Sequence, residues 1–369
     1  PWIAGVSSLF TREFFASARA RLAPGGIMCQ WVNAYNINEA DLKSVIATFT
    51  SVFPEGTVWL VGGDDVLLLA TMEPLADAAA RIETRMSLPR VGADLASLGV
   101  ADAFSLRSLQ QAGPAALATF ASGAPVFTDD HLTLEFTAPR ELHSPNAGKN
   151  GTALRRLNTP GPVATAAQLR NRAAMLAKAD HYDQAFDDYA AAIGVDPHDD
   201  EALAGLVTTA VILKKPDEAL AVVRPGNASP DTAVRQAAVS KLLAAAGRRD
   251  EALSAARNAV SMAPQSPTGY EQLAALFAEA SDTVLLDTVV ADLRKVAPSH
   301  AATEFYSAVA AFLHGGAADA VSLANKAIDL DPNYTASYDL VGAALTKLAQ
   351  VPLARQAFDK SLSFNAHDS

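Results

Sequence analysis

Five side chains have types that could line one wall of a binding pocket: Trp2, Gln30, Tyr35, Asp129 and Asp130. Gln30 lies near the C-terminal end of an apolar, strand-like run, and open α/β sheets bind ligands outside the carboxyl ends of their strands. The two adjacent carboxylates could hold an amine. Simpler interpretations stay open, because the backbone could satisfy the amide, and acidic pairs before a strand are commonly turn or cap residues.

Other catalytic patterns are missing from the sequence. It contains no GxGxxG turn, and Gly5-Val6-Ser7-Ser8 lacks the second glycine of a nucleophile elbow. The seven histidines show no metal-ligand spacing, so we expect no metal. The single cysteine, Cys29, excludes an internal disulfide, and its apolar neighbours predict a buried, inert thiol.

The elements that would position these residues follow from periodicity and turn residues. Thr11 caps a predicted helix that Pro24-Gly25-Gly26 ends. The nearly all-apolar run 27–32 then predicts a parallel strand covered on both faces. Asn38 and Asp41 open a second predicted helix, which closes before residue 57.

Two short apolar runs, 57–61 and 66–70, flank a Gly-Gly-Asp-Asp segment that indicates a hairpin. Residues 73–125 have helix-like, Ala- and Leu-rich sequence, and alternation over 132–136 predicts one more strand. Helix, parallel strand, helix, strand and antiparallel partner form the closing half of a doubly wound α/β sheet.

Several stretches carry a resemblance to a known family. They are residues 1–15 (PWIAGVSSLFTREFF), 22–26 (LAPGG), 30–31 (QW) and 128–140 (TDDHLTLEFTAPR). This part of the chain resembles the spermidine synthase family, especially bacterial forms fused to other modules. The resemblance implies the fold of class I methyltransferases and aminopropyl transfer from decarboxylated S-adenosylmethionine, as co-substrate, to a diamine.

The resemblance also implies that Trp2, Gln30, Tyr35, Asp129 and Asp130 are substrate-binding residues. In the family, the catalytic aspartate lies just before the counterpart of Pro1-Trp2, and the glycine-rich nucleoside site lies further upstream. Neither is present in this sequence, so we assign no catalytic residue. We expect a transferase in the parent protein and an inactive fragment here.

The second half of the chain repeats every 34 residues. Prolines recur at positions 197, 230, 264, 298 and 332, with Ala366 at the next step. Twelve residues before most of these positions lies a small residue, namely Ala185, Ala252, Ala320 or Ala354. Aromatic, small and proline residues at this period resemble the tetratricopeptide repeat (TPR), a helical hairpin whose stacks form an α-solenoid. Pro225 and Leu286 depart from the pattern and predict local distortion.

The predicted organisation is therefore an α/β part followed by an all-α part. Residues 1–143 form the partial synthase-like domain, 144–165 a Gly/Pro-rich linker, and 166–369 six TPR-like repeats. The repeats are expected to hold a protein or peptide on their concave face, with scaffolding alone as the alternative. No basic clamp for a carboxylate terminus is obvious, because the paired cations fall at helix ends.

The net charge of the chain limits the classes of partner that it is expected to bind. The chain has 40 acidic and 29 basic residues, a net charge of -11, which disfavours nucleic acid. No apolar run approaches the roughly 20 residues that span a bilayer, so we expect no membrane contact by this segment. A cytoplasmic location follows, with attachment to an upstream membrane domain implied by the fused forms.

Three functions compete at this stage. The first is an aminopropyltransferase that uses a diamine or polyamine and carries a TPR extension. The second is an inactive or methyltransferase-like domain that serves mainly in protein interaction through the repeats. The third makes the repeats the functional part, recruiting a protein to a membrane-linked parent.

Overall fold

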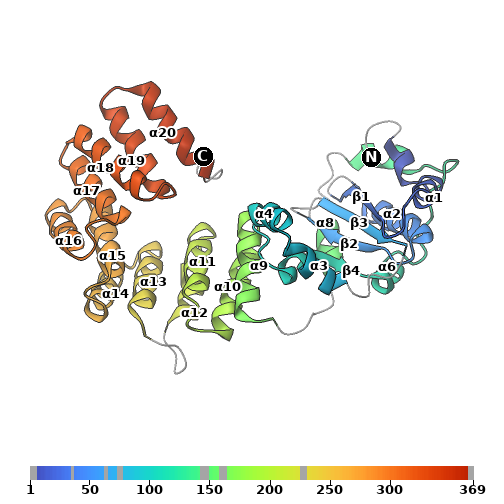
Figure 1. Ribbon diagram of the computed structural model, residues 1–369, viewed down its shortest axis with the longest axis horizontal. Helices are drawn as coiled ribbons and strands as arrows, with labels where there is room; N and C mark the ends of the chain where they lie inside the picture. The colour runs from blue at the N-terminus through green and yellow to red at the C-terminus, as the bar shows by residue number, and fades with distance from the viewer. Residues whose placement is uncertain are drawn as a thin grey trace. The chain divides into compact units, whose positions relative to one another are not determined.

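The structure is a computed structural model that describes residues 6–34, 37–61, 65–72, 78–141, 149–157, 164–224 and 231–364 (Figure 1). It divides into two compact units, Pro1–Ala192 and Ile193–Ser369. The predicted turn at 62–64, most of the predicted linker, and Pro225, Pro230 and Ala366 lie outside the described residues. The predicted domain boundaries stay a prediction.

The first unit begins with a small sheet and its covering helices. Their bounds are η1 Val6–Phe10, α1 Arg12–Arg19, β1 Ile27–Asn33, α2 Glu39–Val52, β2 Thr57–Leu60 and β3 Asp65–Thr71. The predicted caps are confirmed, since Thr11 Oγ1 accepts from the Phe14 amide at 3.2 Å and Asn38 Oδ1 accepts from the Asp41 amide at 2.8 Å. The predicted hairpin of β2 and β3 is also confirmed.

Short helices and one further strand complete this unit. They are α3 Ala78–Met86, α4 Pro89–Ser97, α5 Ala103–Ser108, β4 Gln110–Ala112, α6 Pro114–Phe120, α7 Leu134–Thr137, η2 Ala138–Glu141, α8 Lys149–Arg155, α9 Ala166–Lys178 and α10 Tyr182–Val195. The strand predicted over 132–136 is wrong, because α7 occupies most of it. Leu134 alone of its apolar residues is fully buried there, while Phe136 is 71% exposed.

The sheet differs from the predicted parallel arrangement. Its order is β1-β3-β2-β4, and every described ladder is antiparallel. β1 and β2 do run in the same direction, but β3 returns from the hairpin and pairs between them. A parallel β1–β2 ladder is therefore replaced by two antiparallel ones.

Only one face of the sheet is fully covered. Val66, Leu68 and Ala70 of β3 are buried against the core that α1, α2 and α6 complete. On the opposite face Ile27 and Trp31 are 62% and 49% exposed, and Cys29 is exposed as well. The predictions of a strand covered on both faces and of a buried thiol are wrong, because no layer of the described residues packs over this part of β1.

The second unit consists of antiparallel helices with a regular period. Their bounds are α11 Asp200–Ile212, α12 Pro216–Val223, α13 Ala233–Ala245, α14 Arg249–Met262, α15 Pro267–Glu279, α16 Thr283–Val296, α17 Ala301–Leu313, α18 Ala317–Leu330, α19 Thr335–Lys347 and α20 Val351–Phe364. With α9 and α10, the described residues contain six hairpins at steps of 33 or 34 residues. The hairpins of the second unit form the predicted α-solenoid.

Proline and small residues act as the sequence predicts. Each of α10, α14, α16 and α18 ends two residues before a repeat proline, because proline cannot continue the helix. Ala185, Ala252 and Ala320 are fully buried, and Ala354 is nearly so. Leu286, the larger residue at the same position, is also fully buried, so its hairpin accommodates it. The second hairpin is distorted, since α12 has 8 residues where α14 has 14.

The turn inside every hairpin has one residue with a left-handed backbone. These residues are Asp180, Lys214, Gly247, Ser281, Gly315 and Ala349, with φ between +54° and +87°. Only two of the six are glycine, the residue that adopts this conformation without a steric penalty. The hairpin geometry therefore imposes the conformation whatever residue the sequence supplies.

Candidate functional site

Gln30 is the best described of the predicted pocket residues. It lies in β1 opposite Leu68, on the covered side of the sheet, and is partly buried. Its Nε2 donates to the carbonyl oxygen of its neighbour Trp31 at 3.1 Å. The side-chain amide of Gln30 is therefore satisfied by the backbone, which was the simpler of the two interpretations of this residue. Trp2 and Tyr35 lie outside the described residues.

Asp129 and Asp130 form an exposed turn between Thr128 and His131. The His131 amide donates to the Thr128 carbonyl oxygen at 3.0 Å, and the Asp129 amide donates to Glu13 Oε2 at 3.1 Å. The pKa of Glu13 is lowered, mainly by a hydrogen bond from the backbone of Glu13 itself and to a lesser extent by the one from the Asp129 amide. No hydrogen bond or ion pair among the described residues joins this turn to Gln30, so a substrate role for the predicted set stays a prediction.

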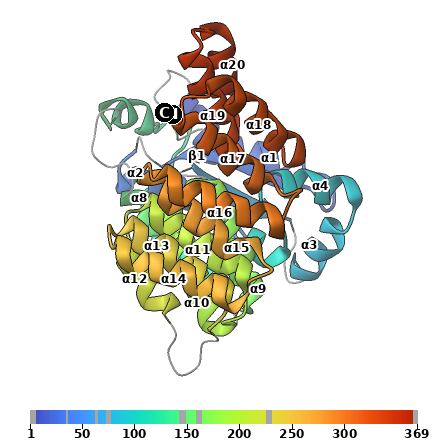
Figure 2. The same ribbon diagram turned by 90° about the vertical axis from the view of Figure 1, so that its left-hand side faces the viewer.

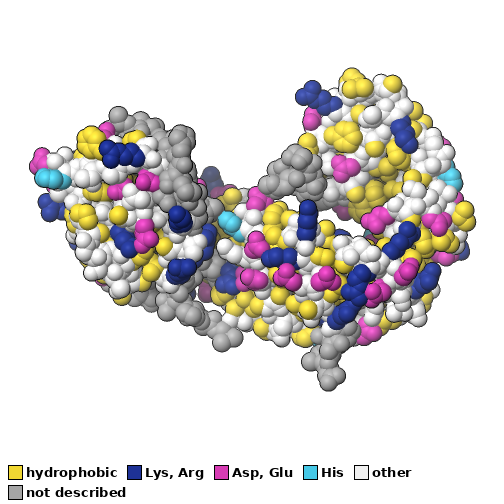
Figure 3. All heavy atoms as spheres, turned by 180° about the vertical axis from the view of Figure 1, so that it is seen from behind, with side chains coloured by type: hydrophobic (Ala, Val, Ile, Leu, Met, Phe, Trp, Pro, Cys, Tyr) yellow, Lys and Arg dark blue, Asp and Glu magenta, His cyan; other side chains and the backbone are white. Residues whose placement is uncertain are grey.

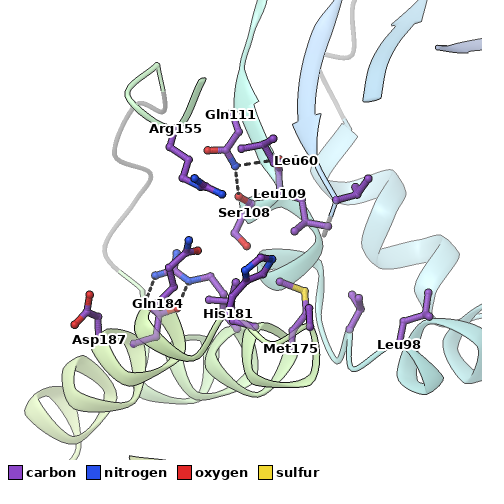
Figure 4. Close-up of a pocket in the computed structure, with 16 residues that line it drawn as sticks. Leu60, Leu98, Ser108, Leu109, Gln111, Arg155, Met175, His181, Gln184 and Asp187 are labelled. Carbon is purple, nitrogen blue, oxygen red and sulfur yellow. Dashed lines mark hydrogen bonds and ion pairs between the residues drawn. The ribbon is translucent and has the colours of Figure 1, made fainter. Parts of the chain in front are cut away.

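A cavity of about 580 Å³ lies within the first unit (Figure 4). Leu60 at the end of β2 and Leu109 before β4 form one wall, and Met175 of α9 lies opposite. α9 is held here because Asn171 Nδ2 donates to Asp102 Oδ2 at 2.8 Å. The first repeat hairpin thus packs against the helices that follow the sheet.

The polar groups of this cavity are largely engaged by the protein itself. Arg172 Nε donates to Asp188 Oδ2 at 2.6 Å, and the guanidinium of Arg172 lies 5.2 Å from the ring centroid of Phe104. Gln111 Nε2 donates to the carbonyl oxygens of Ser108 and Leu109, both at 3.1 Å (Figure 4). Ser108 and His181 also line the cavity, and the Ser108 hydroxyl donates to the carbonyl oxygen of Ser105 at 2.7 Å. Among the described residues, the cavity therefore shows mainly packing and internal pairing.

The first helices of the repeats form a second candidate surface. Within the second unit, α11, α13, α15, α17 and α19 contact one another in succession, and each second helix packs against the first helices next to it (Figure 2). Figure 3 shows one face of these repeats, on which apolar, acidic and basic side chains are interspersed. The layer presents side chains from successive repeats to one side, as a docking surface requires.

An aromatic and acidic cluster joins three of these first helices. It consists of Glu271 of α15, His300 and Phe305 at the start of α17, Tyr306, and Tyr334 before α19. The Phe305 ring centroid lies 5.0 Å from that of Tyr306 and 5.1 Å from that of Tyr334. His300 Nδ1 lies 3.3 Å from Glu271 Oε1. Each distance is within the range of an attractive contact.

The electrostatics of the cluster favour binding of a positively charged group. Burial raises the pKa of Glu271, and the neighbouring His300 opposes that shift. Burial also raises the pKa of both tyrosines, and the Glu271 carboxylate adds to each shift. A positive charge near these groups would be attracted by the carboxylate and by the faces of the rings.

As predicted, the paired cations fall at helix ends: Arg248 immediately precedes α14 and binds Glu251, and Lys295 in the last turn of α16 binds Asp292 at 2.8 Å. Across the described residues no group of three or more metal-ligating side chains occurs. None of the described helices combines the length and apolarity needed to cross a membrane.

Sequence reasoning missed the cluster. Phe305 and Tyr306 occupy a first helix between His300 and Tyr334, and the 34-residue period alone aligns Glu271 with Phe305 in neighbouring repeats. Aligning the first helices position by position would have brought these residues onto one face. Their contacts with Tyr334, which precedes the next repeat, depend on how the hairpins stack.

Comparison with known proteins gives only solved structures. No family model and no curated protein matches the chain. A tetratricopeptide repeat protein from Parabacteroides merdae is 16% identical over 60% of this chain and 87% of its own, with a TM-score of 0.45. MamA from Desulfovibrio magneticus is 16% identical over 46% of this chain and 97% of its own, with a TM-score of 0.33.

YrrB, a TPR protein with an unusual peptide-binding site, is 18% identical over 47% of this chain and 89% of its own, with a TM-score of 0.30. At these values the assignment of the repeats rests on the helices of this chain. The spermidine synthase resemblance is corrected: no family model supports it, and the described residues form helical hairpins with only a small antiparallel sheet in place of a doubly wound one. Aminopropyl transfer, a polyamine partner and decarboxylated S-adenosylmethionine have no support beyond that resemblance.

Proposed function

We propose that this chain is a protein-interaction scaffold that holds a partner segment along the first helices of its repeats. The observation that carries the proposal is the cluster of Glu271, His300, Phe305, Tyr306 and Tyr334, which spans three successive repeats on the layer those helices share. A segment that crosses successive repeats can contact the whole cluster, and an extended peptide has that reach.

The chemistry of the cluster indicates the partner. Phe305 and Tyr334 are aromatic and partly exposed, and Glu271 is a carboxylate whose side chain is 26% exposed. A lysine or arginine beside an apolar residue would complement both features. The chain's net charge of -11 would also speed the approach of a basic segment.

A display library of random peptides, selected on the full-length chain, tests the proposal. We expect enriched peptides to combine basic and apolar residues. Phe305→Ala should weaken them by roughly 30-fold, the effect of a central interface residue worth about 2 kcal/mol. Glu271→Lys should weaken basic peptides at least as much, because it replaces attraction by repulsion.

Matched control variants lie on the second helices. Glu218→Lys makes the same charge change at an exposed position of α12, and Val284→Ala truncates a side chain of α16 that is 74% exposed. Both should change affinity less than about twofold, since surface positions outside a contact contribute little. Failure to enrich any peptide, or equal binding by Phe305→Ala and Val284→Ala, would refute the proposal.

A further inference from the structure

A second cavity, of about 440 Å³, lies on the incompletely covered face of the sheet. Trp59 of β2 and Leu69 of β3 form its floor, and Ile82 and Met86 of α3 with Leu95 of α4 form its sides. Its volume is within the range of about 300–1000 Å³ typical of small-molecule sites. Of its polar groups, the indole Nε1 of Trp59 already donates to Thr57 Oγ1 at 2.9 Å, so the walls are almost wholly apolar.

Two cations border this apolar space. Arg81 and Arg85 are one turn apart on α3, both line the cavity and both are exposed. No hydrogen bond or ion pair is recorded for either guanidinium among the described residues. The acidic residue of the same helix, Glu83, lies about 200° around the helix from Arg81 and so faces away from the pair. Among the described residues, the rim of the cavity therefore carries two cations and no carboxylate paired with them.

We propose that this cavity binds a fatty acid, with the chain against the sheet and the carboxylate at Arg81 and Arg85. Apolar walls satisfy a hydrocarbon chain and offer no partners for a peptide backbone, which would lose its hydrogen bonds to water. A pair of guanidinium groups suits a carboxylate, which accepts several hydrogen bonds in one plane. If a methylene fills about as much space as a water molecule, about 30 Å³, the cavity of about 440 Å³ has room for a chain of up to about fifteen carbons.

The site is separate from the proposed docking layer, because all of its residues belong to the first unit. Loss of peptide binding would leave it unaffected, and the reverse also holds. The two proposals can therefore fail independently.

Calorimetric titration of the full-length chain with octanoate, decanoate and dodecanoate, each below its micelle concentration, tests the proposal. We expect one site per chain and a gain of about fourfold in affinity per methylene, from about 0.8 kcal/mol per buried CH₂. Dodecanol, which has the same chain without the charge, should bind roughly fivefold more weakly, as expected for an exposed ion pair worth about 1 kcal/mol.

Variants separate the head group from the chain. The double variant Arg81→Gln/Arg85→Gln should reduce dodecanoate binding to the level of dodecanol and leave dodecanol binding unchanged. Val91→Trp, at a partly exposed lining position of α4, should weaken both ligands by filling space. Arg90→Gln is the control for the arginine variant, because Arg90 is exposed on α4 but does not line the cavity.

Circular dichroism would establish that each variant stays folded, and the surface positions of both arginines make that the expected result. Absence of saturable binding, no dependence on chain length, or equal loss in Arg81→Gln/Arg85→Gln and Arg90→Gln would overturn the proposal. Dodecanol binding as strong as dodecanoate would overturn the role of the arginines.

Discussion

Arg235 of α13 is the largest side chain that is fully buried, and it should hold the second and third hairpins together. Its Nη1 donates to the carbonyl oxygen of Val223 at 2.9 Å, and its Nη2 donates to that of Pro197 at 2.6 Å. Val223 ends the shortened α12, where the last carbonyl groups have no partner within the helix. The arginine therefore supplies one of the hydrogen bonds that a longer α12 would have made, and ties the end of α12 to the turn before α11.

The magnitude follows from opposing terms. Arg235→Met removes two charge-assisted hydrogen bonds, worth about 1.5–3 kcal/mol each, and leaves both carbonyl oxygens unpaired. Against this, it relieves the burial of a charge, which costs several kcal/mol and lowers the pKa of this guanidinium. We expect a net loss of about 2–4 kcal/mol, equivalent to a roughly 30- to 1000-fold rise in the local opening constant.

Hydrogen exchange followed by mass spectrometry on the full-length chain resolves this effect, because repeat proteins open locally. Peptides from α12 and α13 should lose protection, while those from α19 and α20 should not. Arg257→Met is the control, since Arg257 is exposed on α14 of the same hairpin. If Arg235→Met exchanges no faster than Arg257→Met, Arg235 does not join the hairpins and the reasoning is wrong.

Three further predictions concern the last repeats. Gly342→Ala should cost about 1–3 kcal/mol, because the added Cβ would lie 2.6 Å from the ring of Phe358, and chemical denaturation would measure the loss. Ala349→Gly should stabilise by up to about 1 kcal/mol, because Ala349 has a φ of +58°, and the same denaturation series would detect it. Glu271→Gln should change how stability depends on pH. Burial raises the folded-state pKa of Glu271 above its ordinary value of 4.5, so protonated Glu271 stabilises the folded state below pH 4.5, and this stabilisation is lost as pH rises through the folded-state pKa. The variant should lack this loss, which unfolding curves at several pH values would measure.

Controls for these predictions come from the same chain. Gly194→Ala has open space for its Cβ and should stabilise α10, whereas a loss like that of Gly342→Ala would remove the steric explanation. Gly247→Ala should destabilise its turn, where φ is +74°, and no change would contradict the argument from left-handed residues. An unaltered pH profile in Glu271→Gln would show that this carboxyl does not govern the loss.

Much of the fold could be predicted from local signals. Thr11 and Asn38 were recognised as caps because an N-cap depends only on residues within one turn of it. Helix ends before the repeat prolines were equally clear, since proline blocks a helix by its own geometry. The hairpin of β2 and β3 belongs to the same class, because its strands are close in sequence.

Non-local pairing defeated prediction elsewhere. The apolar run 27–32 was interpreted as a parallel strand covered on both faces, yet β3 pairs with it antiparallel and its outer face stays exposed. A run of apolar residues records burial preference but not which strand becomes its neighbour. The strand predicted over 132–136 was wrong for a related reason, because a few alternating residues fit a short helix as well as a strand.

By itself, the sequence determined the repeat: the 34-residue period, the small residues where helices meet and the prolines after them are local requirements of a helical hairpin. Tertiary structure alone decided which side chains meet. It placed the guanidinium of Arg235 on two distant carbonyl groups, gathered the rings around Phe305 from separate repeats, and left Arg81 and Arg85 beside an apolar cavity. Such contacts depend on the stacking of elements far apart in the chain, and no single stretch of sequence encodes that stacking.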